Sequence, residues 1–109
     1  MNDLMDQMAR LNTELTSSIK LLRKNGDALA EAERDYQIAK SQTVLRMKEQ
    51  GCTITEIGLS IKGKEGVAEK MFKRDVAQVM YDANKEHINV VKLQLRIIES
   101  QIEREWSNG

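Results

Sequence analysis

Two residue types that act as nucleophile and base in many enzymes occur once each in this chain, as Cys52 and His87. A cysteine–histidine pair acts in acyl transfer when the imidazole takes the thiol proton, but it also needs an orienting group and donors for the oxyanion. Cys52 falls at a predicted connector, and His87 falls many helical turns away in a predicted helix. We therefore interpret Cys52 as a small inert residue and His87 as a polar position in a helix seam.

One segment fits most of the pattern of a phosphate-binding loop. Residues 58–64, GLSIKGK, match G-x-x-x-x-G-K, but Glu65 stands where Ser or Thr would ligate magnesium. A carboxylate there repels phosphate, and the preceding sequence predicts a helix instead of the strand that such a loop follows. We interpret the segment as a turn in which Gly63 precedes a helix, and we expect no nucleotide site.

Paired carboxylates could hold a metal or act as general acid and base. The pairs Glu31 with Asp35 and Glu99 with Glu103 are each spaced along a single helix face. The di-iron bundle pattern needs Glu-x-x-His, but the residue three before the only histidine is Asn84. We interpret these carboxylates as solvated surface charge, and we expect no metal, no cofactor and no enzymatic activity.

The elements that must position all these residues are helices. The 109 residues include no proline, and residues that favour helices dominate. We predict an all-α fold, a long coiled-coil-like antiparallel helical hairpin with a short helix at the connector, forming a single domain over residues 1–109. The predicted helices span about 3–49, 53–61 and 64–106.

The first predicted helix carries a heptad seam. Its spacing of four and three residues continues from the N-terminus to the predicted end of the helix, through Leu4, Met8, Leu11, Leu15, Ser18, Leu22, Asn25, Leu29, Ala32, Tyr36, Ala39 and Thr43. Asn25-Gly26 could instead cap one helix, with Asp27 starting another. The unbroken register favours one helix, bent or frayed near residues 25–26, because an internal glycine costs only about 1 kcal/mol relative to alanine.

The connector between the two long helices starts at Gly51. Gly51 ends the first helix, and Thr53 and Glu56 form a capping box in which each side chain satisfies a free backbone N–H.

The last helix has a broad apolar stripe, made of Val91, Leu95, Ile98, Ile102 and Trp106, widened by Val90 and Ile97 and extended upstream by Phe72, Val76, Val79 and Ala83. A stripe this broad contacts two neighbours, so we predict a twofold homodimer that forms a helical bundle.

Charge and composition exclude several classes of protein. The 17 basic and 17 acidic residues balance, so the chain as a whole is not a basic nucleic-acid binder. A single cysteine excludes a scaffold held by internal disulfides. We find no signal peptide and no apolar run long enough to cross a membrane, so we expect a soluble, cytoplasmic protein with no membrane partner.

Positive charge gathers at the connector. Residues 40–74 hold 8 basic and 4 acidic residues, whereas the segments before and after are net acidic. The connector has the rhythm of a helix-turn-helix, with residues 64–74 as its recognition helix and Val67, Met71 and Phe72 facing inward. The candidate nucleic-acid contacts are Lys62, Lys64, Lys70, Lys73 and Arg74.

The connector also has a purely structural interpretation. Any turn between helices needs a cap, a glycine and apolar contacts. Glu65 and Glu69 oppose phosphates, Glu69 is spaced to pair with Lys73, and residues 64–74 hold no Asn or Gln suited to base edges.

The opposite ends of the long helices form a second candidate surface. If the hairpin is antiparallel, they bring together Leu4, Met8, Leu11, Leu15, Ile98, Ile102 and Trp106. Methionine adapts to irregular surfaces, and tryptophan is a common anchor at interfaces. These residues form either the core of a dimer or a groove for a foreign protein.

Three stretches carry a family resemblance: residues 30–36 (AEAERDY), 72–81 (FKRDVAQVMY) and 93–106 (LQLRIIESQIEREW). Over roughly residues 27–107 they resemble small uncharacterised all-helical accessory proteins of temperate phages and prophages of Gram-positive bacteria. That family has no established activity or binding residues, so the resemblance assigns no site. It implies a bacterial host cytoplasm and a protein that acts by binding.

The resulting hypothesis is a non-enzymatic phage-type accessory protein that binds a host or phage protein. Inhibition of a host defence nuclease, in the manner of anti-CRISPR proteins, is one concrete form of it. The alternatives are a nucleic-acid-binding accessory protein of replication or recombination that uses the basic connector, and a virion or assembly component that only multimerises.

Overall fold

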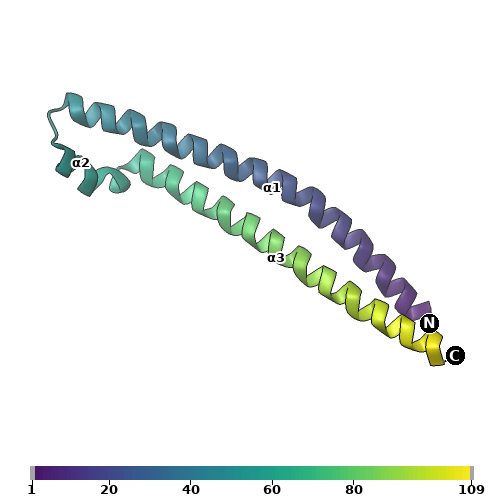
Figure 1. The fold of residues 1–109 in the computed structure, drawn as a ribbon. Helices are drawn as coiled ribbons and strands as arrows, with labels where there is room; N and C mark the ends of the chain where they lie inside the picture. The colour runs from purple at the N-terminus through teal and green to yellow at the C-terminus, as the bar shows by residue number, and fades with distance from the viewer. Residues whose placement is uncertain (1, 109) are drawn as a thin grey trace. The chain divides into compact units, whose positions relative to one another are not determined.

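The computed structural model describes residues 2–108, which form helices joined by short turns (Figure 1). Helix α1 spans Asn2–Glu49, α2 spans Ile54–Ser60, the 3₁₀ turn η1 spans Ile61–Gly63, and α3 spans Glu65–Asn108. The predicted all-α hairpin is confirmed, and residues 2–108 contain no strand. Helix α1 runs unbroken through Asn25-Gly26, so the alternative of two helices there is wrong.

Contacts divide the chain into two compact units. Unit 1 comprises Met1–Lys24 and Tyr81–Gly109, and unit 2 comprises Asn25–Met80. Unit 1 pairs the N-terminal part of α1 with the C-terminal part of α3. Unit 2 contains the rest of both long helices together with α2 and η1.

In unit 1 the two helices run antiparallel and share a narrow apolar seam. Ser18 contacts Asn84 and Glu14 contacts His87, so residue numbers fall along α1 as they rise along α3. The predicted heptad positions of α1 are buried or half-buried. They meet the buried α3 side chains of Ile88, Val91, Leu95 and Ile98.

Unit 2 has a core built at the connector. Five buried side chains form one cluster, with Val44, Cys52 and Met71 packed against it: Tyr36, Met47, Ile57, Ile61 and Val67. The heptad positions of α1 from Asn25 to Thr43 are buried or half-buried here too, so the predicted seam is confirmed along α1.

The connector begins with a glycine-dependent helix end. The Gly51 N–H bonds the Lys48 carbonyl and the Cys52 N–H bonds the Met47 carbonyl, each at 3.0 Å. Gly51 has a φ of +85°, which an L side chain adopts only with strain. This confirms Gly51 as the end of the first helix.

Thr53 then caps α2, as predicted. The Glu56 N–H donates to Thr53 Oγ1 at 3.1 Å. The Glu56 carboxylate, however, accepts from the Thr53 hydroxyl at 3.0 Å instead of reaching a backbone N–H. Of the two side chain-to-backbone hydrogen bonds of the predicted capping box, only the one from the Glu56 N–H to Thr53 is present. In place of the other, the side chains of Thr53 and Glu56 bond each other.

The predicted upstream extension of the α3 stripe does not pack on α1. Phe72, Val76, Val79 and Ala83 are exposed, Phe72 by 67%. Their spacing belongs to a second heptad series on the other side of the helix. The positions that face α1 in this part of α3 include Val67, Arg74 and Tyr81.

Candidate functional site

A groove lies between the N-terminal turns of α1 and the C-terminal turns of α3 in unit 1. It encloses about 370 Å³. Its apolar lining comes from both helices and consists of Met5, Met8, Ile102 and Trp106. The Trp106 side chain is 72% exposed, so a large aromatic surface faces solvent. Flexible methionines beside an exposed tryptophan are typical of surfaces that bind apolar side chains.

The groove has an acidic edge. Glu99 and Glu103 lie one helical turn apart on α3 and complete its lining. Both side chains are exposed to solvent. From the sequence alone, both carboxylates are expected to be plain surface charge. Their spacing next to Ile102 and Trp106 was the available signal, but only the pairing with α1 shows that they border a hollow.

The structure distributes the predicted interface residues among different environments. Ile98 is buried, and Leu4, Met8, Leu11, Leu15 and Ile102 are half-buried in the seam between α1 and α3 of unit 1. Most of this set therefore packs inside the unit. Met8, Ile102 and Trp106 also line the groove described above, which we name the Trp106 groove.

A second groove of about 440 Å³ lies further along unit 1. Leu11, Ile97 and Ile98 form its apolar part, and Gln7, Arg10, Glu14 and Gln94 its polar part. Next to it, His87 Nε2 lies 2.8 Å from Glu14 Oε1, so His87 pairs across the seam. We name this hollow the Ile97 groove.

The predicted basic surface of unit 2 is partly neutralised. Lys62 and Lys64 are exposed at η1 and at the start of α3. Lys73 Nζ lies 3.3 Å from Glu69 Oε1, which confirms the expected pair. Lys70 is half-buried along a shallow hollow that Glu31 and Asp35 also line.

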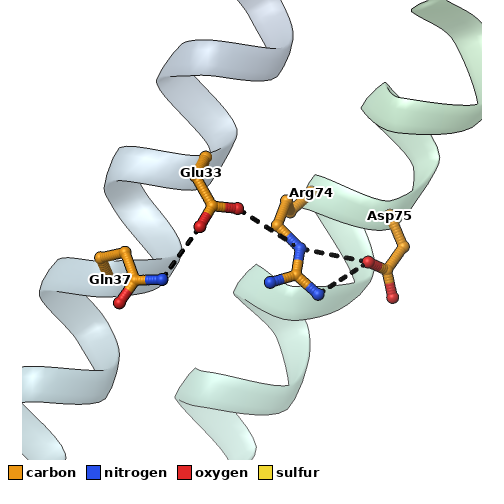
Figure 2. A network of polar contacts seen from close by, with 4 residues as sticks. All are labelled: Glu33, Gln37, Arg74 and Asp75. Atoms are coloured by element: carbon orange, nitrogen blue, oxygen red, sulfur yellow. Dashed lines mark hydrogen bonds and ion pairs between the residues drawn. The ribbon is translucent and has the colours of Figure 1, made fainter.

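The Arg74 side chain makes polar contacts with Glu33 and Asp75 within unit 2 (Figure 2). Its guanidinium lies 4.4 Å from the centre of the buried Tyr36 ring. Its Nε is 3.5 Å from Glu33 Oε2, and its Nη2 donates to Asp75 Oδ1 at 2.9 Å. Glu33 in turn accepts a hydrogen bond from Gln37 at 2.9 Å.

These contacts keep Arg74 charged and in place. The hydrogen bond to Asp75 raises the pKa of Arg74, and the nearby charge of Glu33 acts in the same direction. The prediction of Arg74 as an exposed contact on a recognition helix is wrong, because its position faces Tyr36 and a planar guanidinium stacks well on an aromatic ring. Phe72, predicted to face inward, points to solvent, whereas Val67 is buried and Met71 packs on the core as predicted.

The structure also places the residues that the sequence analysis considered for catalysis, phosphate binding and metal binding. Cys52 is half-buried and packs against the core of unit 2. In the segment that matches the phosphate-loop pattern, residues 58–63 lie in α2 and η1, and Lys64 follows η1 as its C-cap. Within residues 2–108, no group of three or more His, Cys, Asp or Glu side chains is arranged to hold a metal ion.

Comparison with known protein families, curated proteins and solved structures found no match. In the part of the chain that the structure describes, none of the helices has an apolar stretch suited to crossing a membrane.

Proposed function

We propose that this chain is a non-enzymatic binding protein that holds a helical segment of another protein in the Trp106 groove. The observation that carries the proposal is the exposure of Trp106 beside Met5 in a groove with an apolar lining. An exposed apolar patch with polar residues at its rim is typical of a surface that binds another molecule. Binding through such an anchor needs no catalytic group.

The edge of the groove defines the chemistry of the partner segment. Glu99 and Glu103 favour basic side chains, and Met8 and Ile102 favour apolar ones. The expected partner is therefore an amphipathic helix with leucine-like residues on one face and Lys or Arg beside them.

Trp106 is the only tryptophan, so its fluorescence reports directly on the groove. The test titrates the full chain with a synthetic leucine–lysine helix and with a leucine–glutamate helix. We expect a saturable blue shift with the basic helix only. The double variant Glu99→Lys with Glu103→Lys should reverse this preference.

The matched control is Glu65→Lys with Glu69→Lys, a pair of exposed glutamates at the same spacing on α3 in unit 2. It should leave the titration unchanged. Equal shifts with both helices, or loss of binding in the control as well, would contradict the proposal.

The resemblance to phage proteins suggests one biological form of this activity, inhibition of a host defence nuclease. Such nucleases present basic surfaces to nucleic acid, and these match the acidic edge of the groove. Adding the purified chain to a cleavage assay should then reduce cleavage, and Trp106→Ala should restore it. Ile54→Ala, which alters an exposed apolar residue in unit 2, serves as the control.

A second candidate, nucleic-acid binding, is favoured by the exposure of Lys62 and Lys64. Lys64, directly before α3, and Arg46, near the end of α1, both line a hollow of about 270 Å³ in unit 2. Such binding would weaken steeply with salt. In a mobility-shift assay, Lys62→Glu with Lys64→Glu should abolish a low-salt shift, whereas Lys92→Glu in unit 1 should not. Absence of any shift at low salt would exclude this candidate.

A further inference from the structure

Helix α3 carries apolar side chains on two opposite faces. The inner face packs on α1 within each unit and repeats every seven residues, as at Ile88, Leu95 and Ile102. A second series lies two and five residues after these positions, about 200° and 140° around the helix. We name it the outer stripe, and its large members are 42–67% exposed: Phe72, Val76, Val79, Val90, Leu93 and Ile97.

Helix α1 also has exposed large apolar side chains, but they are spread over three heptad positions and form no comparable series: Met5, Ile19, Leu21, Ile38 and Leu45. Every seventh residue along its solvent side, from Asp6 to Ser41, is exposed and polar: Asp6, Thr13, Lys20, Asp27, Arg34 and Ser41. The outer stripe is thus a feature of α3 alone. An apolar heptad series of this length is a seam that another helix covers.

We propose that the outer stripe is the self-association surface, and that two copies pack their α3 helices antiparallel through it. Phe72, Val76 and Val79 in unit 2 of one copy then lie on Ile97, Leu93 and Val90 in unit 1 of the other. The same contact forms twice about a twofold axis between Asn84 and Lys85. The proposal goes beyond partner binding, because it uses a different face of α3 from the Trp106 groove.

The register follows from the sequence of the stripe. In every opposed pair the residue numbers have the same sum, so Phe72 meets Ile97, Val76 meets Leu93 and Val79 meets Val90. The central pair is Ala83 with Glu86. An antiparallel shift by one heptad leaves Phe72 or Ile97 without an apolar opposite, so one register uses the whole stripe.

Charges beside the stripe select the same arrangement. Asp75 and Arg96 are exposed, and each directly precedes a stripe residue. The antiparallel register brings Asp75 of one copy to within about two residues of the level of Arg96 of the other, and this contact forms twice. A parallel pairing would set Glu86 directly against Glu86 in one layer, whereas the antiparallel register sets each Glu86 against Ala83 in two adjacent layers. Asp75 already accepts hydrogen bonds from Arg74, and a carboxylate can accept from a second guanidinium as well.

The surface of unit 1 fits the largest side chain of the stripe. Ile97, which lies opposite Phe72 in this register, lines the Ile97 groove of about 440 Å³ with Leu11 and Ile98. The Phe72 ring of the second copy has room to enter this groove as a knob. The stripe ends at Ile97, before the Trp106 groove begins.

The first test measures association of the full chain by sedimentation equilibrium, with helix content checked by circular dichroism. We expect a dimer for the wild type. Leu93→Lys should weaken it by about a hundredfold or more, because the charge enters an apolar layer twice. Ile38→Lys, at a similarly exposed position on α1, should leave association unchanged.

Charge reversal tests the flanking pair. Asp75→Arg and Arg96→Asp should each weaken the dimer by about tenfold. The double variant should recover most of the loss, because it restores two opposite-charge contacts in the exchanged orientation.

Cross-linking tests the direction, in a Cys52→Ser background that removes the native thiol. Val79→Cys with Val90→Cys should give a disulfide-linked dimer on oxidation. Val79→Cys alone should not, because the two copies of residue 79 would lie about 16 Å apart along the axis. A monomer at all concentrations, a dimer insensitive to Leu93→Lys, or cross-linking by Val79→Cys alone would each overturn the proposal.

Discussion

The side-chain amide of Asn84 donates a hydrogen bond of 3.1 Å to the backbone carbonyl of Ser18, and both residues are 7% exposed. Each occupies a heptad seam position on its own helix within unit 1. A polar group in an apolar seam is satisfied only when the two helices stand in one register. The bond therefore fixes the alignment of α1 with α3 in unit 1.

Two substitutions of Asn84 should have different effects, one on the free energy of unfolding and the other on the register of α1 against α3 in unit 1. Asn84→Asp should lower the free energy of unfolding by about 2 kcal/mol at neutral pH, because a buried carboxylate has no proton to donate to the Ser18 carbonyl. Asn84→Leu should leave stability equal or higher but allow several registers. Thermal unfolding measures the first effect, and doubled amide signals in NMR spectra the second.

The seam of unit 1 should depend on its buried aliphatic side chains. Ile88→Ala should cost about 3 kcal/mol, because it removes a side chain that is only 6% exposed and leaves a cavity. The matched control, Ile19→Ala, changes a half-exposed isoleucine of the same unit and should cost less than about 0.5 kcal/mol. If urea unfolding shows the same loss of unfolding free energy for both variants, the prediction that Ile88 packs in the seam is contradicted.

The heptad seam of α1 was predictable because it is the only apolar series on that helix. On α3 two series overlap, and hydrophobicity alone cannot tell which faces α1. The ambiguity is worst in unit 2, where the inner series includes Arg74 and the outer one includes Phe72. Tyr36 and Glu33 on α1 stabilise the arginine inside, and this depends on the pairing of two distant segments.

The candidate site was predictable to a similar degree. The sequence placed Met8, Ile102 and Trp106 at one end of an antiparallel hairpin. It could not show that Glu99 and Glu103 border the same hollow, because that depends on how α3 is rotated against α1.

Two glycines near the connector should respond in opposite directions to alanine. Gly51→Ala should destabilise by about 1 kcal/mol, because a Cβ is strained at a φ of +85°. Gly58→Ala should stabilise by about 1 kcal/mol, since alanine favours the helix and the new Cβ meets nothing within 4 Å. Thermal melts of the two variants should therefore shift oppositely.

The cap of α2 should act locally. Thr53→Ala should cost about 1 kcal/mol, because the Glu56 N–H loses its acceptor. Hydrogen exchange should rise at the first amides of α2 and remain unchanged in unit 1. Thr55→Ala, an exposed change within the first turn, should leave the exchange pattern intact.

The Arg74 contacts should be insensitive to pH across the neutral range. A basic group whose pKa is raised on folding contributes stability below its unfolded pKa, and this is lost only as pH rises through the folded value. Arg74→Gln should therefore lower the melting temperature by the same amount at every pH from about 6 to 9. A difference that shrinks within this range would show that another group controls the contact.

The separation of 66 residues between Ser18 and Asn84 has a consequence for the order of folding. Core contacts in unit 2, such as those of Met47 and Ile57, close short loops beside the connector, and closure entropy grows with loop length. Pairing should start there and proceed outward along the two helices. During synthesis the first turns of α1 are made before their partner segment in α3, so their apolar side chains stay uncovered until that segment has been made.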